Sequence, residues 1–158
     1  VLGCTLALVL LTSCASMQGT VVTRTRLDKE VAGRIAYTAI DAQSSVGRFS
    51  QADLDQLKEA VRVRVPQPAG GAVPVTIRLT VTDYGPGASN MTVAVRVVDA
   101  TGKLYAHFDV RQTASEVLGT VYDQRTSVIN AVADRVAYSL MALPQAPAPA
   151  IDARDYGS

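Results

Sequence analysis

The sequence predicts a two-layer α+β sandwich, in which an antiparallel meander of three to four strands carries two amphipathic helices on one face. Three segments between residues 75 and 111 alternate apolar and polar side chains, as strands with one covered face do. Two further segments, 50–65 and 121–143, repeat apolar residues every three or four positions, as surface helices do. In chain order the elements read β-α-β-β-β-α, which is typical of two packed layers.

The three alternating segments are the most regular feature of the chain. Each has an apolar residue at every second position, with threonine, arginine or other residues between them. We expect the apolar set to face the helices and most of the remaining side chains to face solvent. The apolar positions are Val75, Ile77, Leu79, Val81, Met91, Val93, Val95, Val97, Leu104, Ala106, Phe108 and Val110.

The turn at 99–102 joins the last two strands, and side-chain parity predicts their register. Pairing Asp99 with Lys103 would bring apolar residues of one strand and polar residues of the other onto the same face. Pairing Val98 with Lys103 avoids this conflict. We therefore expect a four-residue turn with Gly102 in a left-handed conformation. The predicted neighbours are Val97 and Leu104, Val95 and Ala106, and Val93 and Phe108.

Two segments show the helical period. Ser50-Gln51-Ala52-Asp53 has the form of a capping box, and apolar residues follow it at spacings of three and four until Pro66. Val121–Leu143 shows a similar pattern and ends before Pro144, with Asp134 and Arg135 facing away from its apolar stripe. The apolar face of the first helix comprises Leu54, Leu57, Val61 and Val65.

The remaining segments are less regular. Residues 15–33 have the composition of a linker, within which Thr20–Arg26 is rich enough in valine and threonine for an edge strand. Arg34–Asp41 fits a strand by composition and a helix by spacing, and we favour a strand because Gly33 would weaken a helix. Tyr84–Asn90 is rich in glycine, but it joins two strands and lacks the lysine of a phosphate-binding loop, so we interpret it as a hairpin tip.

Composition argues against several classes of function. The formal net charge is +1 and the basic residues are scattered, which argues against a nucleic-acid partner. Aromatic residues make up 5% of the chain and tryptophan is absent, so base-stacking platforms and carbohydrate clefts are not favoured. His107 is the only histidine and the carboxylates are scattered, so we predict neither a metal site nor a cofactor.

An apolar, uncharged run, Val1–Leu11, is too short to span a bilayer as a helix. It leads into Leu11-Thr12-Ser13-Cys14, which resembles the lipobox of bacterial lipoproteins. The resemblance implies that residues 1–13 belong to a signal peptide whose basic first part precedes Val1. It also implies that Cys14 carries a thioether-linked diacylglycerol and an amide-linked acyl chain, which together give stable anchoring. Cys4 would be lost with the signal peptide.

The same resemblance implies a location and an organisation. Lipoproteins kept at the inner membrane mainly have aspartate directly after the cysteine, whereas this chain has Ala15 and Ser16. This difference implies the periplasmic face of the outer membrane in a Gram-negative cell. We expect a lipidated cysteine and linker over 14–33, a single α+β domain over 34–143 and a disordered Pro/Ala-rich tail over 144–158.

The layout of the domain resembles small α+β envelope lipoproteins, such as the lipopolysaccharide-assembly lipoprotein and the lipoprotein activators of peptidoglycan synthases. The resemblance is specific at the lipobox, whereas over residues 34–143 it is limited to the order of the predicted strands and helices. No functional residue is transferred from these families.

The polar face of the predicted sheet is the candidate site. It would suit a partner protein, a glycan strand or an anionic headgroup, and the alternative is an ordinary solvated face. An unpaired sheet edge offers a second way to bind a partner strand. The candidate residues of the polar face are Arg78, Arg96, Tyr105, His107 and Arg111.

Three functions are consistent with these observations. The favoured one is a non-catalytic accessory or structural component of an envelope assembly, anchored by lipid and bound to an envelope protein. The first alternative is a carrier with a small-molecule or lipid pocket between helices and sheet. The second is an envelope hydrolase, which needs His107, or a carboxylate pair such as Asp83 and Asp109, to converge on a substrate. In the predicted register His107 neighbours Thr92 and Ala94, and neither completes a triad.

Overall fold

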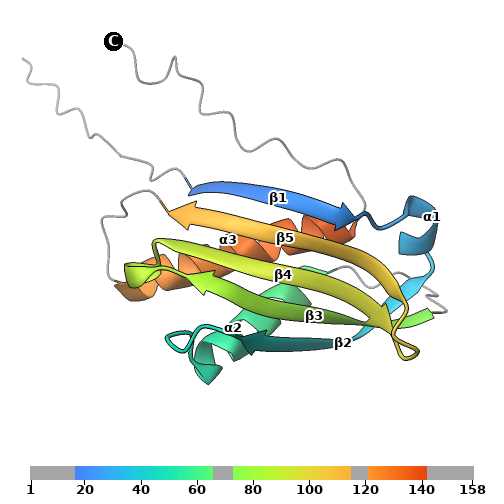
Figure 1. The fold of residues 1–158 in the computed structure, drawn as a ribbon, viewed down its shortest axis with the longest axis horizontal. Helices are drawn as coiled ribbons and strands as arrows, with labels where there is room; N and C mark the ends of the chain where they lie inside the picture. The colour runs from blue at the N-terminus through green and yellow to red at the C-terminus, as the bar shows by residue number, and fades with distance from the viewer. Residues whose placement is uncertain (1–16, 66–72, 115–120, 142–158) are drawn as a thin grey trace, which may run out of the picture.

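The computed structural model describes residues 17–65, 73–114 and 121–141. Five strands form one sheet in the order β1-β5-β4-β3-β2 (Figure 1). The strands are β1 (Met17–Thr25), β2 (Ile35–Ser44), β3 (Val73–Tyr84), β4 (Asn90–Asp99) and β5 (Leu104–Ala114). The helices are α1 (Lys29–Ala32), α2 (Gln51–Arg62) and α3 (Val121–Leu140), and a 3-10 turn, η1 (Pro86–Ala88), lies between β3 and β4.

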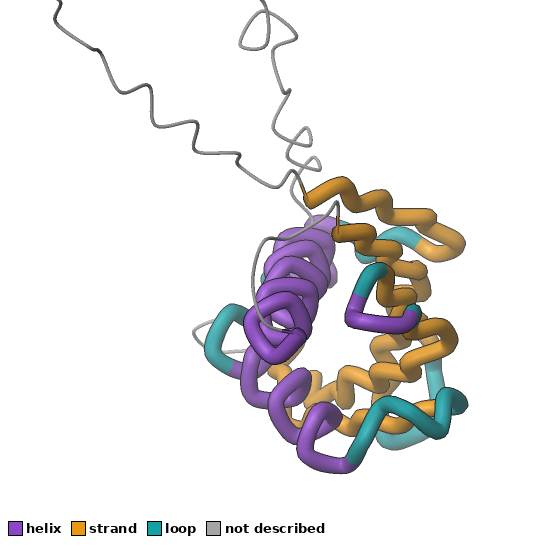
Figure 2. Tube along the Cα trace, turned by 90° about the vertical axis from the view of Figure 1, so that its left-hand side faces the viewer, coloured by secondary structure: helices purple, strands orange, loops and turns teal. Residues whose placement is uncertain are grey.

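Two layers make up the domain. Figure 2 shows α2 and α3 together on one side of the sheet. The predicted α+β class with two helices on one face is therefore confirmed. Among the described residues, none of the helices combines the length and the apolar character needed to cross a membrane. The predicted signal peptide over 1–13, Cys14 and the tail over 144–158 lie outside the described residues.

The sheet is mixed and has five strands, where we expected a wholly antiparallel sheet of three or four. β3, β4 and β5 form the predicted antiparallel meander. β2 confirms the strand favoured for Arg34–Asp41, but it pairs with β3 in parallel. The direction follows from α2, because a helical connection carries the chain back to the end of the sheet at which β2 began.

The edge strand predicted at Thr20–Arg26 is present as β1, which pairs antiparallel with β5 so that Val21 lies opposite Val110. Because β1 belongs to the sheet, the domain begins before residue 34, and the expected linker over 14–33 is too long. A side chain at Gly19 would overlap the side chains of Arg135 and Gln112. Glycine thus lets β1 pass close to α3.

Arg135 does not face away from the core as predicted. It is half-buried on α3, and its Nε donates a hydrogen bond to the Oε1 of buried Gln112 at 2.9 Å. Asp134, by contrast, is exposed as predicted, and its carboxylate pairs with the Arg64 side chain at 2.5 Å. The helical period alone misplaced Arg135 because a long side chain can reach a buried partner from the rim of the apolar stripe.

The start of α2 confirms the predicted capping box. Ser50 Oγ accepts from the backbone N–H of Asp53 at 3.3 Å, and Asp53 Oδ2 accepts from the backbone N–H of Ser50 at 2.9 Å. The Asp53 side chain is buried, and its other oxygen accepts from Arg125 of α3 at 3.0 Å. Arg125 also donates to the hydroxyl of Tyr84 at 3.2 Å. The cap therefore joins α2, α3 and the end of β3.

The β4–β5 hairpin has Gly102 in the predicted left-handed region, at φ 85°. The predicted register is wrong by two residues, because Val95 lies opposite Phe108 rather than Ala106. The backbone N–H of Asp99 donates to the carbonyl of Lys103 at 3.1 Å. This is the pairing that the alternation of side chains argued against in the sequence. A β-bulge beside the turn restores the parity, since Val97 pairs with Ala106 and Val98 with Leu104, which leaves Tyr105 as the extra residue.

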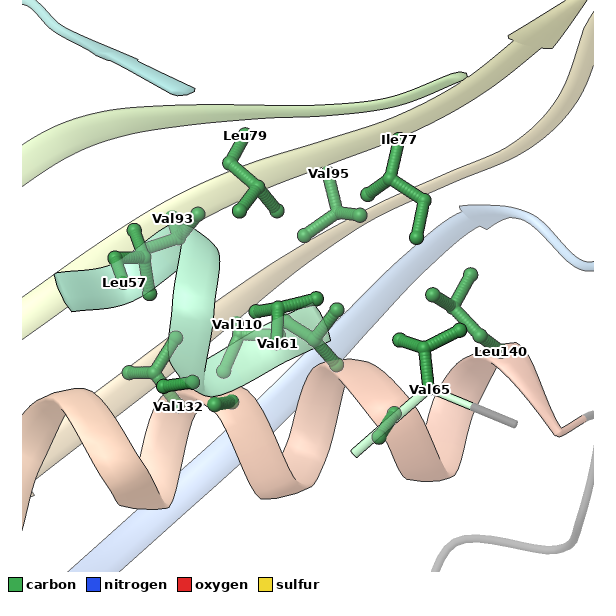
Figure 3. Close-up of a cluster of buried hydrophobic side chains, with 14 of the residues drawn as sticks. Leu57, Val61, Val65, Ile77, Leu79, Val93, Val95, Val110, Val132 and Leu140 are labelled. Atoms are coloured by element: carbon green, nitrogen blue, oxygen red, sulfur yellow. The ribbon is translucent and has the colours of Figure 1, made fainter. Parts of the chain in front are cut away.

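The core lies between the sheet and the two long helices (Figure 3). It is formed by the apolar sets predicted for β3 and β4, most of that predicted for β5, and the apolar faces of α2 and α3. Leu57 and Val61 of α2 and Val132 of α3 are among its fully buried side chains. The short valine and alanine side chains allow close packing of two thin layers.

The two valines at the end of α2 provide a matched test of this core. Val61 is 0% exposed, whereas Val63 is 62% exposed. We expect Val61→Ala to lower the free energy of unfolding by about 2 kcal/mol, through lost burial and the cavity left behind. Val63→Ala should change it by less than about 0.5 kcal/mol. Urea unfolding of both variants measures the difference, and equal losses would contradict the assigned core.

Candidate functional site

The face of the sheet opposite the helices is called the open face below. Strand alternation places the predicted polar set there, because neighbouring residues such as Val95 and Val97 point into the core. Its side chains include Thr20, Val22 and Arg24 of β1, His107, Asp109 and Arg111 of β5, Thr92, Ala94 and Arg96 of β4, Thr76, Arg78, Thr80 and Asp83 of β3, and Asp41 and Gln43 of β2.

Three candidate residues meet in one row across the strands. Arg96 of β4 lies directly opposite Arg78 of β3 on one side and His107 of β5 on the other. Arg78 in turn lies opposite Asp41 of β2, which ends the row at the sheet edge. Arg78 and Arg96 are exposed, and His107 is half-buried. The sheet therefore holds two guanidinium-bearing side chains and the only histidine side by side.

Neither arginine of this row forms an ion pair with a described residue, although Asp41 of β2 lies opposite Arg78. Within the described part of the chain, no salt bridge joins Arg78, Arg96 or Arg111 to a carboxylate. The nearby Asp109 is already paired, because Arg24 of β1 donates to its Oδ2 at 3.1 Å. Like charges directly opposite on neighbouring strands are destabilising. The Arg78–Arg96 pair is thus an unfavourable feature of the isolated domain.

Arg111 belongs to the open face but not to the row. It lies opposite Thr92 of β4 and Thr20 of β1. Arg111 lies four positions beyond His107 on β5, which corresponds to about 13 Å along the strand. Arg111 therefore contributes positive charge to the face without joining the Arg78–Arg96 pair.

Tyr105 serves the β4–β5 turn rather than the row. Its hydroxyl donates to Asp99 Oδ2 at 3.0 Å, and Lys103 Nζ lies 5.1 Å from the centre of its ring. The pKa of Tyr105 is raised, mainly by desolvation and to a smaller extent by the hydrogen bond to Asp99. The other Asp99 oxygen accepts from the Thr101 hydroxyl at 2.6 Å and from the backbone N–H of Lys103 at 3.0 Å. These donors, chiefly Thr101, hold the pKa of Asp99 below its usual range.

The residues considered for hydrolysis do not come together. In the described ranges, no hydrogen bond links His107 to a hydroxyl or a carboxylate. Asp109 pairs with Arg24, whereas Asp83 accepts from the Asn90 side-chain amide at 3.0 Å. Among the same residues, no group of three or more His, Cys, Asp or Glu side chains is placed to hold a metal ion.

A shallow hollow opens beside the row. It has a volume of about 240 Å³, and the side chains of Asp41, Gln43, Arg78 and Thr80 line it. Gln43 Nε2 donates to Thr80 Oγ1 at 3.2 Å, which ties β2 to β3 on this face. The Thr80 hydroxyl can still donate a hydrogen bond to another acceptor. Sequence reasoning missed this hollow because it depends on the position of β2.

A second, larger groove of about 460 Å³ lies between α2 and β2, and it was also missed. Tyr37, Ile40 and Val65 provide apolar lining, and four of its nine lining residues are charged. Those four, Asp55, Lys58, Glu59 and Arg62, follow one another at spacings of three, one and three residues along α2. Their spacing indicates a charged helix side, but only the structure places this side above the edge strand.

Comparison with known proteins gives no family assignment. No family model matches the chain, and no curated protein matches it. Among solved structures, the PelC dodecamer from Paraburkholderia phytofirmans is similar at 12% identity and a TM-score of 0.46, covering 81% of this chain and 100% of that chain. A protein from Xanthomonas campestris described as DUF330 is similar at 12% identity and a TM-score of 0.45, covering 77% and 93%. Similarity at this level assigns neither family nor function.

The Arg78–Arg96 repulsion can be measured directly. We expect Arg96→Gln to raise the free energy of unfolding by about 0.5 kcal/mol at low salt, because it removes the like-charge pair. Arg111→Gln, which has no opposed arginine, is the matched control and should give no such gain. A double-mutant cycle with Arg78→Gln isolates the pair energy, which should shrink at high salt. A favourable coupling between the two arginines would contradict the arrangement.

The hydrogen bonds of the β4–β5 turn lead to a second prediction, which concerns the pKa of Asp99. Thr101→Val removes the main donor to Asp99, so the pKa of Asp99 should rise toward its ordinary value. Because folding lowers this pKa, Asp99 stabilises the fold above its unfolded-state pKa, and the contribution is lost as pH falls through the folded value. Side-chain carbonyl NMR over a pH titration measures the change. Thr23→Val, on exposed β1, is the control and should leave Asp99 unaffected.

Proposed function

We propose that this chain is a lipid-anchored periplasmic lipoprotein that acts as a non-catalytic accessory component of a cell-envelope assembly. The observation that carries the proposal is the motif Leu11-Thr12-Ser13-Cys14 after an uncharged apolar run. Acylation of Cys14 would hold the domain at a membrane, and Ala15 and Ser16 favour the outer membrane.

The position of β1 supports a close attachment. Met17, the first residue of β1, follows Cys14 by three positions. Three residues span at most about 11 Å. An acylated Cys14 would therefore keep the start of the sheet near the membrane surface, where a small domain can meet a membrane-bound partner at high effective concentration. The open face, where Arg78 and Arg96 form no ion pair with a described residue, offers a surface for such contacts.

The carrier alternative is less well supported. A lipid carrier needs an apolar cavity that encloses most of its ligand. The 460 Å³ groove beside α2 is bordered by Asp55, Lys58, Glu59 and Arg62, which do not suit an acyl chain. Among the described residues, apolar side chains from the sheet, α2 and α3 pack together between the layers (Figure 3). We therefore rank the accessory function first.

Acylation tests the proposal. The protein, expressed from its full gene in a Gram-negative host, should begin at Cys14 and carry the mass of diacylglycerol and an acyl chain. Cys14→Ser should abolish acyl labelling and release the domain from washed membranes. Cys4→Ser, within the predicted signal peptide, is the control and should be acylated normally. Retention of Val1, or an unmodified Cys14, would overturn the proposal.

Crosslinking tests the accessory role separately. Envelopes that contain the acylated chain should yield a defined partner after crosslinking, solubilisation and purification of this chain. The same treatment of Cys14→Ser cells should recover less of it, because the domain is no longer held near the membrane. Failure to recover any defined partner with several crosslinkers would contradict the accessory role, even if Cys14 is acylated.

A further inference from the structure

We propose that Arg78 and Arg96 form a binding site for a single phosphoryl group on the open face. The ligand class is a phosphate ester, whether a phospholipid headgroup or a soluble compound. This inference goes beyond the accessory function, and it does not depend on acylation of Cys14. Four features of the row support it: the opposed arginines, nearby hydrogen-bond donors, flanking carboxylates and the rigidity of the central strands.

The opposed arginines are the first feature. Arg78 and Arg96 are register partners on β3 and β4, so their Cα atoms lie about 5 Å apart. Both side chains are exposed, and among the described residues neither forms an ion pair. Guanidinium groups bind phosphate oxygens through paired N–H donors. An anion placed between them would replace a repulsion with two charge-assisted interactions.

Neighbouring donors are the second feature. Thr80 lies two residues from Arg78 on the same face, and both line the 240 Å³ hollow, which Asp41 and Gln43 border on the β2 side. Since the Thr80 hydroxyl accepts from Gln43, its own proton is available to donate to a ligand oxygen. His107, on the far side of Arg96, supplies a ring N–H. A tetrahedral phosphoryl group would thus meet donors on both sides of the arginine pair.

The surrounding carboxylates limit the size of the ligand. Asp41 ends the row beyond Arg78, and Asp109 lies two residues from His107 on β5. A nucleic acid or another long polyanion laid along the row would meet the Asp41 carboxylate, whereas Asp109 is already paired with Arg24. A single phosphoryl group over Arg78 and Arg96 avoids this repulsion. The pattern therefore favours one phosphate ester and argues against a polymer of phosphates.

Rigid placement is the last feature. β3 and β4 are central strands, each paired on both sides. Their core-facing residues Leu79 and Val95, which also lie opposite one another, are 1% and 0% exposed. The backbone that carries the two arginines is therefore fixed before any ligand binds, which reduces the entropic cost of binding.

Two NMR titrations of the purified full chain test the site. In nonionic detergent at constant ionic strength, inorganic phosphate should shift the Nε–H resonances of Arg78 and Arg96 together. In nanodiscs, phosphatidylglycerol in place of phosphatidylcholine should shift the same resonances if the phosphate comes from lipid. A response to inorganic phosphate alone assigns a soluble ligand, and a stronger response to phosphatidylglycerol assigns the membrane. Either result supports the site.

The variants separate a built site from general charge effects. Arg78→Gln/Arg96→Gln should weaken phosphate binding at least tenfold, and it should remain folded because it removes a like-charge pair. Arg34→Gln/Arg48→Gln makes the same change in net charge at exposed positions away from the row and should bind as the unmodified chain does. Equal weakening in both pairs, or no shift of Arg78 and Arg96 in either titration, would overturn the proposal.

Discussion

The alternation of side chains along β3, β4 and β5 is the constraint on which the rest of the structure depends. One set of alternating residues must be buried under α2 and α3, and this fixes the other set on the open face. A shift of one residue in any pairing would expose valines and bury arginines. The bulges of the sheet show how strict this constraint is. Beside the β4–β5 turn, Tyr105 is the extra residue that returns β5 to the required parity.

Sequence reasoning recovers what is encoded locally. The meander, the capping box of Ser50 and Asp53, and the left-handed Gly102 follow from patterns a few residues long, and the structure has all three. The direction and partner of β2 do not follow from such patterns. They depend on which edge of the meander is free after α2 has packed, and this is a property of the whole layer. The inclusion of β1 in the sheet is non-local in the same way, because its partner β5 lies about 85 residues away along the chain.

The open face shows the same division between local and non-local information. Parity alone places Arg78, Arg96, His107 and Arg111 on one face, and the structure confirms that placement. Their neighbours could not be predicted, because the expected register of β4 and β5 was wrong by two residues. A register error of two residues keeps each side chain on the correct face but gives it the wrong partner on the neighbouring strand. The predicted register placed His107 beside Thr92 and Ala94, whereas in the structure it lies opposite Arg96. The sequence analysis therefore missed the contact of Arg96 with His107, and it made no prediction of the β3–β4 register that sets Arg78 opposite Arg96.

The electrostatics of the row explain how a stable domain can keep an unfavourable pair. Both guanidinium groups are exposed, so water and salt screen their repulsion and the cost stays well below the stabilisation from the core. The same pair in the buried layer would be prohibitive. An exposed strand face can thus hold like charges that suit a ligand while lowering the free energy of unfolding only slightly. Because the strands below are fixed by Leu79 and Val95, the arginines cannot relieve their repulsion by moving the backbone. An anion bound between them, as we propose, would relieve it without deforming the sheet.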